Sequence, residues 1–176
     1  MSRKLARWIS TVTAVGLMLL VAAAPAAART PAKQSFRGVI VTSGQSASRV
    51  VVSTLIVGRG IVRGDGRVVE VANRPRDPDT VSRDNLVFRR GSLHLISTTK
   101  TFVPSIDPST CVETVRIRQT QRIHGGTGAF RHASGRLSGR IRGHGVAARN
   151  PDGTCSEQLP ALLEVAVFSM RGKLSL

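Results

Sequence analysis

The chain has 176 residues, with 26 basic and 10 acidic side chains for a net charge of +16, yet it has only five Phe, one Trp and no Tyr. A strongly basic balance favours polyanionic partners such as nucleic acid, anionic lipid or wall polymer. Proteins that bind single-stranded nucleic acid stack its bases on aromatic side chains. The scarcity of rings argues against that class, and we do not expect sequence-specific nucleic acid as a partner.

The first residues predict an export signal. A basic segment at 2–7 precedes an apolar run at 12–24, and three alanines at 26–28 form a small-residue cleavage site. A membrane anchor is the alternative, but a spanning helix needs about 20 apolar residues, and Pro25 interrupts this run. We therefore expect cleavage after Ala28, secretion of the mature chain, and no transmembrane segment after cleavage.

The mature chain, residues 29–176, has the size of one domain. It keeps 23 basic against 10 acidic side chains, a net charge of +13, because three basic residues lie in the signal. Its two cysteines, Cys111 and Cys155, predict a disulfide in an exported protein. Closing a loop of this length stabilises a fold by about 4 kcal/mol in the chain-entropy model. Neither thiol has the neighbouring ligands of a zinc site.

Short β-branched runs bounded by Gly, Pro, Asn or Asp predict an all-β domain. Turn-rich connections are expected at 73–84, 104–110 and 151–153, and no long helix is expected, although 158–167 has the pattern of a short one. The apolar run 162–167 fits either a buried closing strand or a subunit interface, so a homo-oligomer is one expectation. The predicted strands are 36–42, 49–57, 60–63, 67–72, 85–89, 92–98, 112–123, 136–144 and 162–174.

Two of these strands alternate apolar with basic residues, which places a row of arginines on one face. If the strands pair through the glycine-rich connection between them, the arginines form one outward stripe on neighbouring strands. An antiparallel sheet ordinarily keeps one polar, solvated face, so this stripe is either such a face or a site for an anionic partner with salt-dependent affinity. The six residues are Arg116, Arg118, Arg122, Arg136, Arg140 and Arg142.

The same alternation places three polar residues on the core side of strand 112–123. Glu113, Gln119 and Gln121 share the phase of the apolar Val115 and Ile117. A buried amide or carboxylate without a partner costs about 1–3 kcal/mol, so these side chains are candidates to line a pocket. For Glu113 we favour the alternative that it reaches solvent at the end of the strand.

A glycine-rich segment at 123–135, with Gly125, Gly126, Thr127, Gly128, Phe130 and Gly135, resembles the corresponding segment of allene oxide cyclase-like and dirigent-like proteins. It also resembles small secreted actinobacterial proteins of unassigned function. The upstream segment 84–95 is similar to the strand–turn–strand hairpin of those bacterial relatives. The resemblance implies an antiparallel barrel of about eight strands with a central cavity, and an oligomer in the plant members. It assigns no catalytic residue here.

Two motifs with known chemistry are absent from the sequence. The glycine turn lacks the Gly-Lys-Ser/Thr of a phosphate loop, and no Gly-x-Ser-x-Gly elbow occurs. His94, His124, His132 and His144 are interpreted as surface or loop residues, because a metal site needs several ligands at supporting spacing. We predict no metal and no cofactor.

Two functional hypotheses follow. The first is a non-catalytic secreted barrel that binds a small apolar or amphipathic molecule in its cavity, or an anionic envelope component on its arginine face. The alternative is an isomerase or cyclase that folds an unsaturated, lipid-like substrate inside the barrel. An enzyme should have convergent polar groups with perturbed pKa values deep in the cavity, whereas a binder or structural module needs none.

Overall fold

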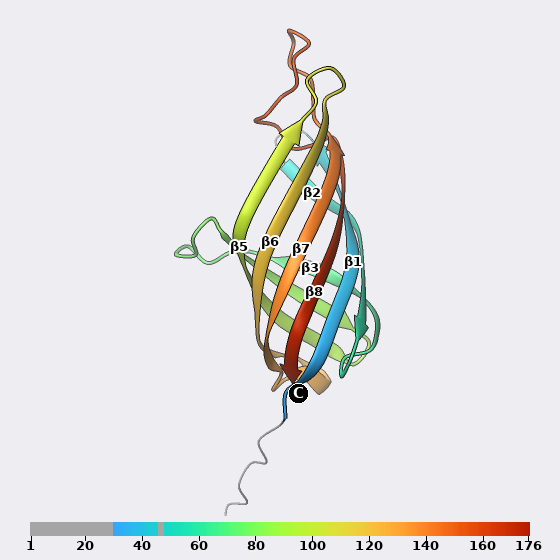
Figure 1. Cartoon of the computed structure of the whole chain (residues 1–176), viewed down its shortest axis with the longest axis vertical. Coiled ribbons are helices and arrows are strands. Elements are labelled where there is room, and N and C mark those ends of the chain that lie inside the picture. Colours follow the sequence, from blue (N-terminus) through green and yellow to red (C-terminus); the bar gives the residue numbers. More distant parts are fainter. Residues whose placement is uncertain (1–29, 46–47) are drawn as a thin grey trace, which may run out of the picture.

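The computed structural model describes residues 30–45 and 48–176, so the predicted signal peptide at 1–28 lies outside the described residues. Eight strands form one closed antiparallel barrel, in which each strand pairs with the next along the chain and the last returns to the first (Figure 1). The predicted all-β barrel is therefore confirmed. The strands are β1 (Ala32–Gln45), β2 (Ser48–Arg59), β3 (Gly64–Val71), β4 (Val81–Phe88), β5 (Gly91–Ile106), β6 (Val112–Gly126), β7 (Ser134–Val146) and β8 (Leu163–Ser175), with a short 3-10 helix η1 (Gly128–Phe130) after β6.

Two of the predicted elements do not form. Residues 60–63 form the turn between β2 and β3 rather than a strand, with Gly60 and Gly64 at positive φ on either side. The side chain of the buried Gln34 accepts a hydrogen bond from Val62 N at 2.9 Å and donates one to Val62 O at 3.0 Å. Both backbone groups of Val62 thus have a partner without a neighbouring strand. The short helix considered at 158–167 does not form, since 158–162 is irregular and β8 begins at Leu163.

A hydrophobic core fills one end of the barrel, at the bottom in Figure 1, where η1 and the C-terminus lie. Phe88 packs between two other rings, with centroids 6.0 Å from Phe36 and 6.2 Å from Phe130 in an edge-on contact. Leu93 and Leu174 are fully buried beside them. Alternating inward side chains supply this core, as the period of two in a strand requires. This end is therefore closed.

The glycine-rich turn lies against the β4–β5 hairpin. Thr127 Oγ1 accepts a hydrogen bond from Ser92 N at 3.0 Å and contacts Ser92 Oγ at 2.9 Å. A Cβ on Gly126 would collide with the carbonyl oxygen of Ser92, so the close approach requires glycine there. The two sequence segments that carry the family resemblance thus pack directly on each other.

The barrel wall is weakest between β2 and β3. Only three positions pair directly, from Ile56 opposite Gly66 to Gly58 opposite Gly64. Beyond them the Thr54 side chain spans the two strands, accepting from Val68 N at 3.0 Å and donating to Val68 O at 3.1 Å. A side chain thus replaces a rung of the backbone ladder at this point.

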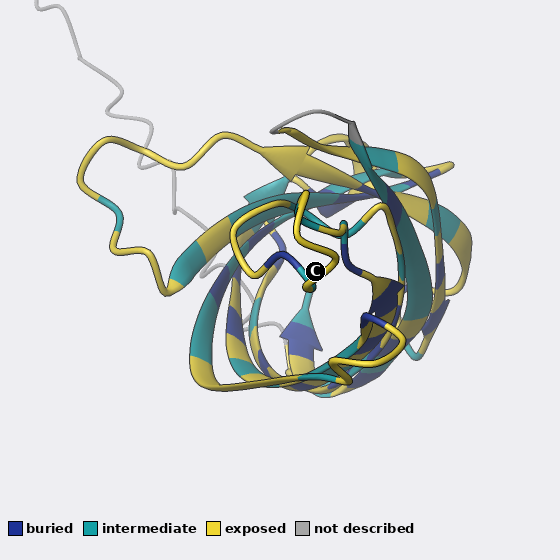
Figure 2. Cartoon of the chain, turned by 90° about the horizontal axis from the view of Figure 1, so that it is seen from above, coloured by how far each residue is buried: buried dark blue, intermediate teal, exposed yellow. Residues whose placement is uncertain are grey.

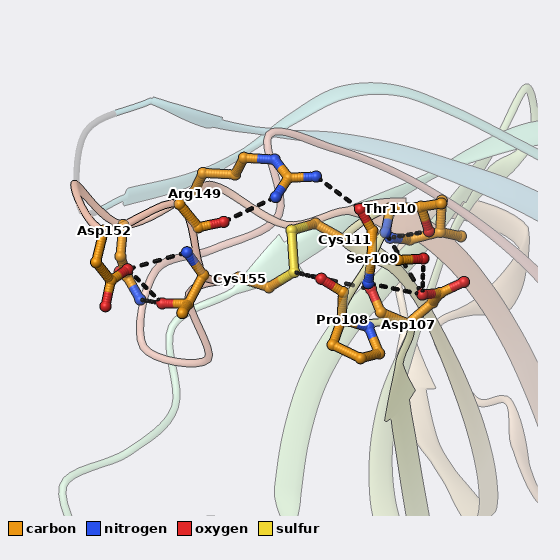
Figure 3. The surroundings of a disulfide bond; sticks show 12 residues. Asp107, Pro108, Ser109, Thr110, Cys111, Arg149, Asp152 and Cys155 are labelled. Carbon is orange, nitrogen blue, oxygen red and sulfur yellow. Dashed lines mark hydrogen bonds between the residues drawn. A yellow bond between two sulfur atoms is a disulfide. The ribbon is translucent and has the colours of Figure 1, made fainter.

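The predicted disulfide joins Cys111 and Cys155, with Cα atoms 5.3 Å apart (Figure 3). It ties the turn between β5 and β6 to the long connection between β7 and β8, at the upper end of Figure 1. Arg149 supports the same junction, donating to Ser109 O at 3.0 Å and to Gly153 O at 2.8 Å. These connections lie over the end of the barrel that Figure 2 views from above.

Candidate functional site

The six predicted arginines lie on the outside of β6 and β7, which run side by side in Figure 1. All six are exposed, and the residues that alternate with them along each strand face the interior. The register places them in three directly opposed pairs, and like charges directly opposite destabilise a sheet. The pairs are Arg116–Arg142, Arg118–Arg140 and Arg122–Arg136.

Neighbouring strands extend this row on both sides. Arg136 lies opposite Lys173 of β8, and Lys173 lies opposite Lys33 of β1. On the other flank, Lys100 of β5 lies beside the arginines of β6 at the bulge between Thr99 and Thr101. We call the full set the basic wall: Lys33, Arg37, Lys100, Arg116, Arg118, Arg122, Arg136, Arg140, Arg142, Arg171 and Lys173, all exposed.

No acidic side chain faces outward from these five strands. Their sequences contain only Glu113 and Glu164, and both lie opposite Gly145 in the register. Both carboxylates line the same hollow at the disulfide end. Within residues 30–45 and 48–176, the two ion pairs are Arg49–Glu70 and Arg83–Asp77, so no residue of the basic wall is in one.

Three hollows follow one another along the outer face of the β6–β7 pair. The first, about 210 Å³, lies at Arg116, Arg142 and Gly143. The second and third, about 530 and 610 Å³, share Thr120 and Ser138, which lie opposite each other. Cations of four strands border these two hollows: Lys100, Arg118, Arg122, Arg136, Arg140 and Arg171. Small residues between long arginines therefore leave room for a bound chain.

The barrel interior holds a second group of polar residues. Gln121 is 3% exposed and donates from Nε2 to Gln119 Oε1 at 3.1 Å. The Oε1 atom of Gln121 is buried without a hydrogen-bond partner. Ser97, also 3% exposed, lies opposite Gln121 on β5. Together with Asp84 these residues line a cavity of about 60 Å³ whose other walls are mainly apolar.

Asp84 is an interior residue that the sequence analysis missed. Its pKa is raised to about 6, mainly by burial and also by the charge of the neighbouring Glu70, while Arg49 acts in the opposite direction. Residues 73–84 were expected to form a loop, but β4 already begins at Val81. The available signal was that Asp84 lies two and four residues before the buried Leu86 and Phe88, and so on the same face of the strand.

Glu113 lies at the other end of the barrel from the aromatic core. It is partly exposed and, with Glu164, lines a hollow of about 620 Å³ beneath the disulfide-linked connections. Burial raises the pKa of Glu113, and the charge of Glu164 adds to that effect. The structure therefore separates Glu113 from the two glutamines, which line the deeper cavity.

The described part of the chain holds neither a metal-binding cluster nor a membrane-spanning helix. Its residues include no group of three or more His, Cys, Asp or Glu side chains placed to hold a metal ion. The rings of His94 and His124 lie 6.0 Å apart, on the paired strands β5 and β6. Residues 30–45 and 48–176 contain no helix with the length and hydropathy that a membrane crossing requires.

Comparisons of the chain with protein-family models, with curated proteins and with solved structures found no match. The resemblance to allene oxide cyclase-like and dirigent-like barrels therefore rests on the residues of the glycine-rich turn and the adjoining hairpin, and it stays a prediction.

Proposed function

We propose that this protein is a non-catalytic, exported barrel that binds an anionic component of the cell envelope through its basic wall. One observation carries the proposal: eleven basic and no acidic side chains face outward on the five adjacent strands β5, β6, β7, β8 and β1. A codon bias toward arginine would raise the total charge, but it would not remove outward acidic side chains from these five strands.

The arrangement of charge also argues for a ligand. Three arginine pairs lie directly opposite each other across β6 and β7, and such pairs disfavour folding. The ten acidic residues of the chain lie on other strands, in loops or toward the interior. A polyanion bound along the wall would relieve this repulsion. Binding would also release the counterions of the polyanion, so the affinity should fall strongly with rising salt concentration.

The test compares two variants of equal charge. In the first, Arg116, Arg118, Arg140 and Arg142 are replaced by Gln. In the control, four exposed arginines outside the wall are replaced by Gln: Arg67, Arg76, Arg89 and Arg90. Binding of each mature protein to purified anionic wall polymer and to anionic lipid vesicles is measured by co-sedimentation over a range of salt concentrations.

We expect the wall variant to lose most of its binding at low salt, and the control variant to bind nearly as the wild type does. Equal losses in the two variants would mean that net charge alone attracts the polymer, and the wall would then have no specific role. Retention of binding by the wall variant would refute the proposal directly.

A second candidate function concerns the interior cavity. The unpartnered Oε1 of Gln121 and the raised pKa of Asp84 are the kind of convergent, perturbed polar groups that binding pockets and active sites contain. They favour a small ligand that offers a hydrogen-bond donor to Gln121. They also suit the active site of an isomerase or cyclase of the allene oxide cyclase type. At about 60 Å³ the cavity has room for a few water molecules or for the polar end of a ligand.

Native mass spectrometry of the exported protein tests this candidate and also reports the oligomeric state. A specific co-purifying molecule that is lost when Gln119 and Gln121 are both replaced by Leu would establish the interior site. An empty barrel in wild type and variant alike would leave the basic wall as the functional surface. In a turnover assay of the purified protein, unchanged activity in the double variant would exclude both glutamines from the reaction.

A further inference from the structure

The basic wall has a repeat along the strands. From Arg116 to Arg122 the outward positions of β6 and their partners on β7 form four successive rungs, each two residues from the next, which is about 6.8 Å in an antiparallel strand. Three rungs carry opposed arginines and one carries opposed hydroxyls. In order, the rungs are Arg116–Arg142, Arg118–Arg140, Thr120–Ser138 and Arg122–Arg136.

The rung formed by Thr120 and Ser138, which we call the hydroxyl rung, has no arginine, but cations of the neighbouring strands lie beside it. Ser138 lies opposite Arg171 on its other side, in β8, and Lys100 borders both hollows that contain Thr120. The side chains of Thr120 and Ser138 are exposed, and each has a hydroxyl that can donate a hydrogen bond. An anionic group placed over this rung would meet two hydroxyl donors inside a ring of cations.

The shape of the wall favours a chain over a planar surface. The three hollows lie in sequence along β6 and β7, from Thr114 at one end to Arg122 at the other. A closed barrel is convex on its outside (Figure 2), so a flat membrane contacts it along a narrow line and leaves the flanking cations of β5 and β8 unengaged. A linear polymer that lies along the strands reaches all four rungs.

The three hollows of the wall are lined by no Phe, Tyr or Trp, and this indicates what the bound polymer lacks. Phe36, Phe88, Phe130 and Phe168 are buried, and the remaining Phe of the described chain, Phe102, lies at the disulfide end, while the imidazole of His144 borders the first hollow. Along the three hollows nucleic-acid bases therefore meet no Phe, Tyr or Trp and a single imidazole, although stacking supplies about 1–3 kcal/mol per base in proteins that bind single strands. A phosphodiester chain without bases has no stacking energy to lose on this surface.

From the spacing, the hollows and their lack of Phe, Tyr and Trp, we propose that the ligand of the basic wall is an unbranched polyol phosphate chain. It lies lengthwise along β6 and β7 with one phosphodiester at each rung, and the phosphate at the hydroxyl rung accepts hydrogen bonds from Thr120 and Ser138. This inference rests on the function proposed above, which requires only an anionic partner, and it adds the spacing and the chemistry of that partner.

The experiment compares four probes that carry equal numbers of negative charges: oligo(glycerol phosphate), inorganic polyphosphate, single-stranded DNA, and an abasic phosphodiester oligomer of the same length as the DNA. Fluorescence anisotropy with end-labelled probes gives the affinity of the mature protein at several salt concentrations. Polyphosphate has the most closely spaced charges, so it binds best if charge density alone decides the affinity.

We expect oligo(glycerol phosphate) to bind at least about tenfold more tightly than polyphosphate, and the abasic oligomer to bind at least as well as DNA. Engagement of about four phosphates predicts a slope of about −3 for log K against log salt concentration, at about 0.7 per phosphate. Replacing Thr120 by Val and Ser138 by Ala should weaken binding of oligo(glycerol phosphate) about fivefold to tenfold, because the charge stays and two hydrogen bonds are lost. The control pair Ser53→Ala and Ser82→Ala removes exposed hydroxyls from β2 and β4 and should leave the affinity unchanged.

The outcomes separate this inference from the proposed function. Tightest binding to polyphosphate, or equal binding to all four probes, would overturn the spaced-chain inference while leaving an anion-binding wall. Preference for DNA over the abasic oligomer would overturn it in favour of nucleic acid. Binding to anionic vesicles without binding to any polymer would replace the chain by a membrane surface. No binding to any anionic probe would refute both proposals.

Discussion

Arg118 of β6 lies directly opposite Arg140 of β7, both side chains are exposed, and neither is in an ion pair among the described residues. The same relationship recurs one rung away, at Arg116 and Arg142. A protein that needed only a soluble surface would gain stability from acidic residues at half of these positions. The basic wall should therefore lower the stability of the free protein by a measurable amount.

Replacing Arg116, Arg118, Arg140 and Arg142 by Gln should raise the melting temperature of the free protein by a few degrees at low ionic strength, because it removes opposed like charges. The gain should shrink in concentrated salt, which screens interactions between exposed charges. Differential scanning calorimetry at two salt concentrations measures both effects. A wall variant that melts below wild type at low salt would contradict the repulsion described here.

Two buried glutamines should respond in opposite ways to replacement by Met, which has a similar shape. Gln34 makes hydrogen bonds to both backbone groups of Val62, so Gln34→Met should lower the free energy of unfolding by about 1–3 kcal/mol. Gln121 has an unpartnered Oε1 and one bond to Gln119, so Gln121→Met should be neutral or stabilising by about 1 kcal/mol.

Urea denaturation of the two glutamine variants measures these changes in the free energy of unfolding. A loss at Gln121 as large as that at Gln34 would mean that the Gln121 oxygen has a partner, such as a water molecule or a retained ligand. Loss of a co-purifying molecule together with that stability would then identify the partner.

Asp84 should give the protein a stability that falls as the pH rises. Burial raises the pKa of this carboxyl from 3.8 to about 6 in the folded state, so folding favours the protonated form. The destabilisation therefore develops between about pH 4 and pH 7 and reaches at most about 3 kcal/mol. Asp84→Asn, which stays neutral, should lack it, and the difference between wild type and variant across this range isolates the Asp84 contribution.

Two other groups change the stability with pH in a different direction or over a different pH range. The pKa of Asp77 is lowered to about 2 by its hydrogen bond with Arg83, so its stabilisation is present above about pH 4 and is lost only in stronger acid. Burial lowers the pKa of His124, so its protonation opposes folding as the pH falls below about 6.5. A difference curve for Asp84 that is flat from pH 4 to pH 7 would show that its carboxyl is solvated rather than buried.

Removing the disulfide by Cys111→Ala and Cys155→Ala should lower the free energy of unfolding by about 4 kcal/mol, because it frees a 44-residue loop in the unfolded chain. Reduction of the wild type should reproduce the loss. Polymer binding should persist wherever the reduced protein stays folded, because the bridge joins connections rather than strands of the wall. Denaturation with and without reductant measures the change, and a loss below about 1 kcal/mol would mean that Arg149 and the neighbouring turns hold the junction without the bridge.

Several features of the fold could be predicted from local sequence. Alternation along β6 and β7 placed the arginines outward and Gln119 and Gln121 inward, because the period of two in a strand assigns each side chain to a face. The two cysteines of an exported chain indicated the bridge. The strand proposed at 60–63 failed for a nonlocal reason: the side chain of Gln34, far away in sequence, satisfies the backbone of Val62 and permits a turn.

Local sequence was enough to predict most of the strands, the disulfide and the sign of the charge, since each of these depends on residue type and near neighbours. The tertiary structure decided which strands lie side by side. Closure of the barrel brings β8 and β1 next to β7, which adds Arg171, Lys173 and Lys33 to the arginine row. Closure also places Asp84 of β4 and Gln121 of β6 around one cavity. Local sequence cannot specify these neighbours, because the register of pairing is set by the whole ring of strands.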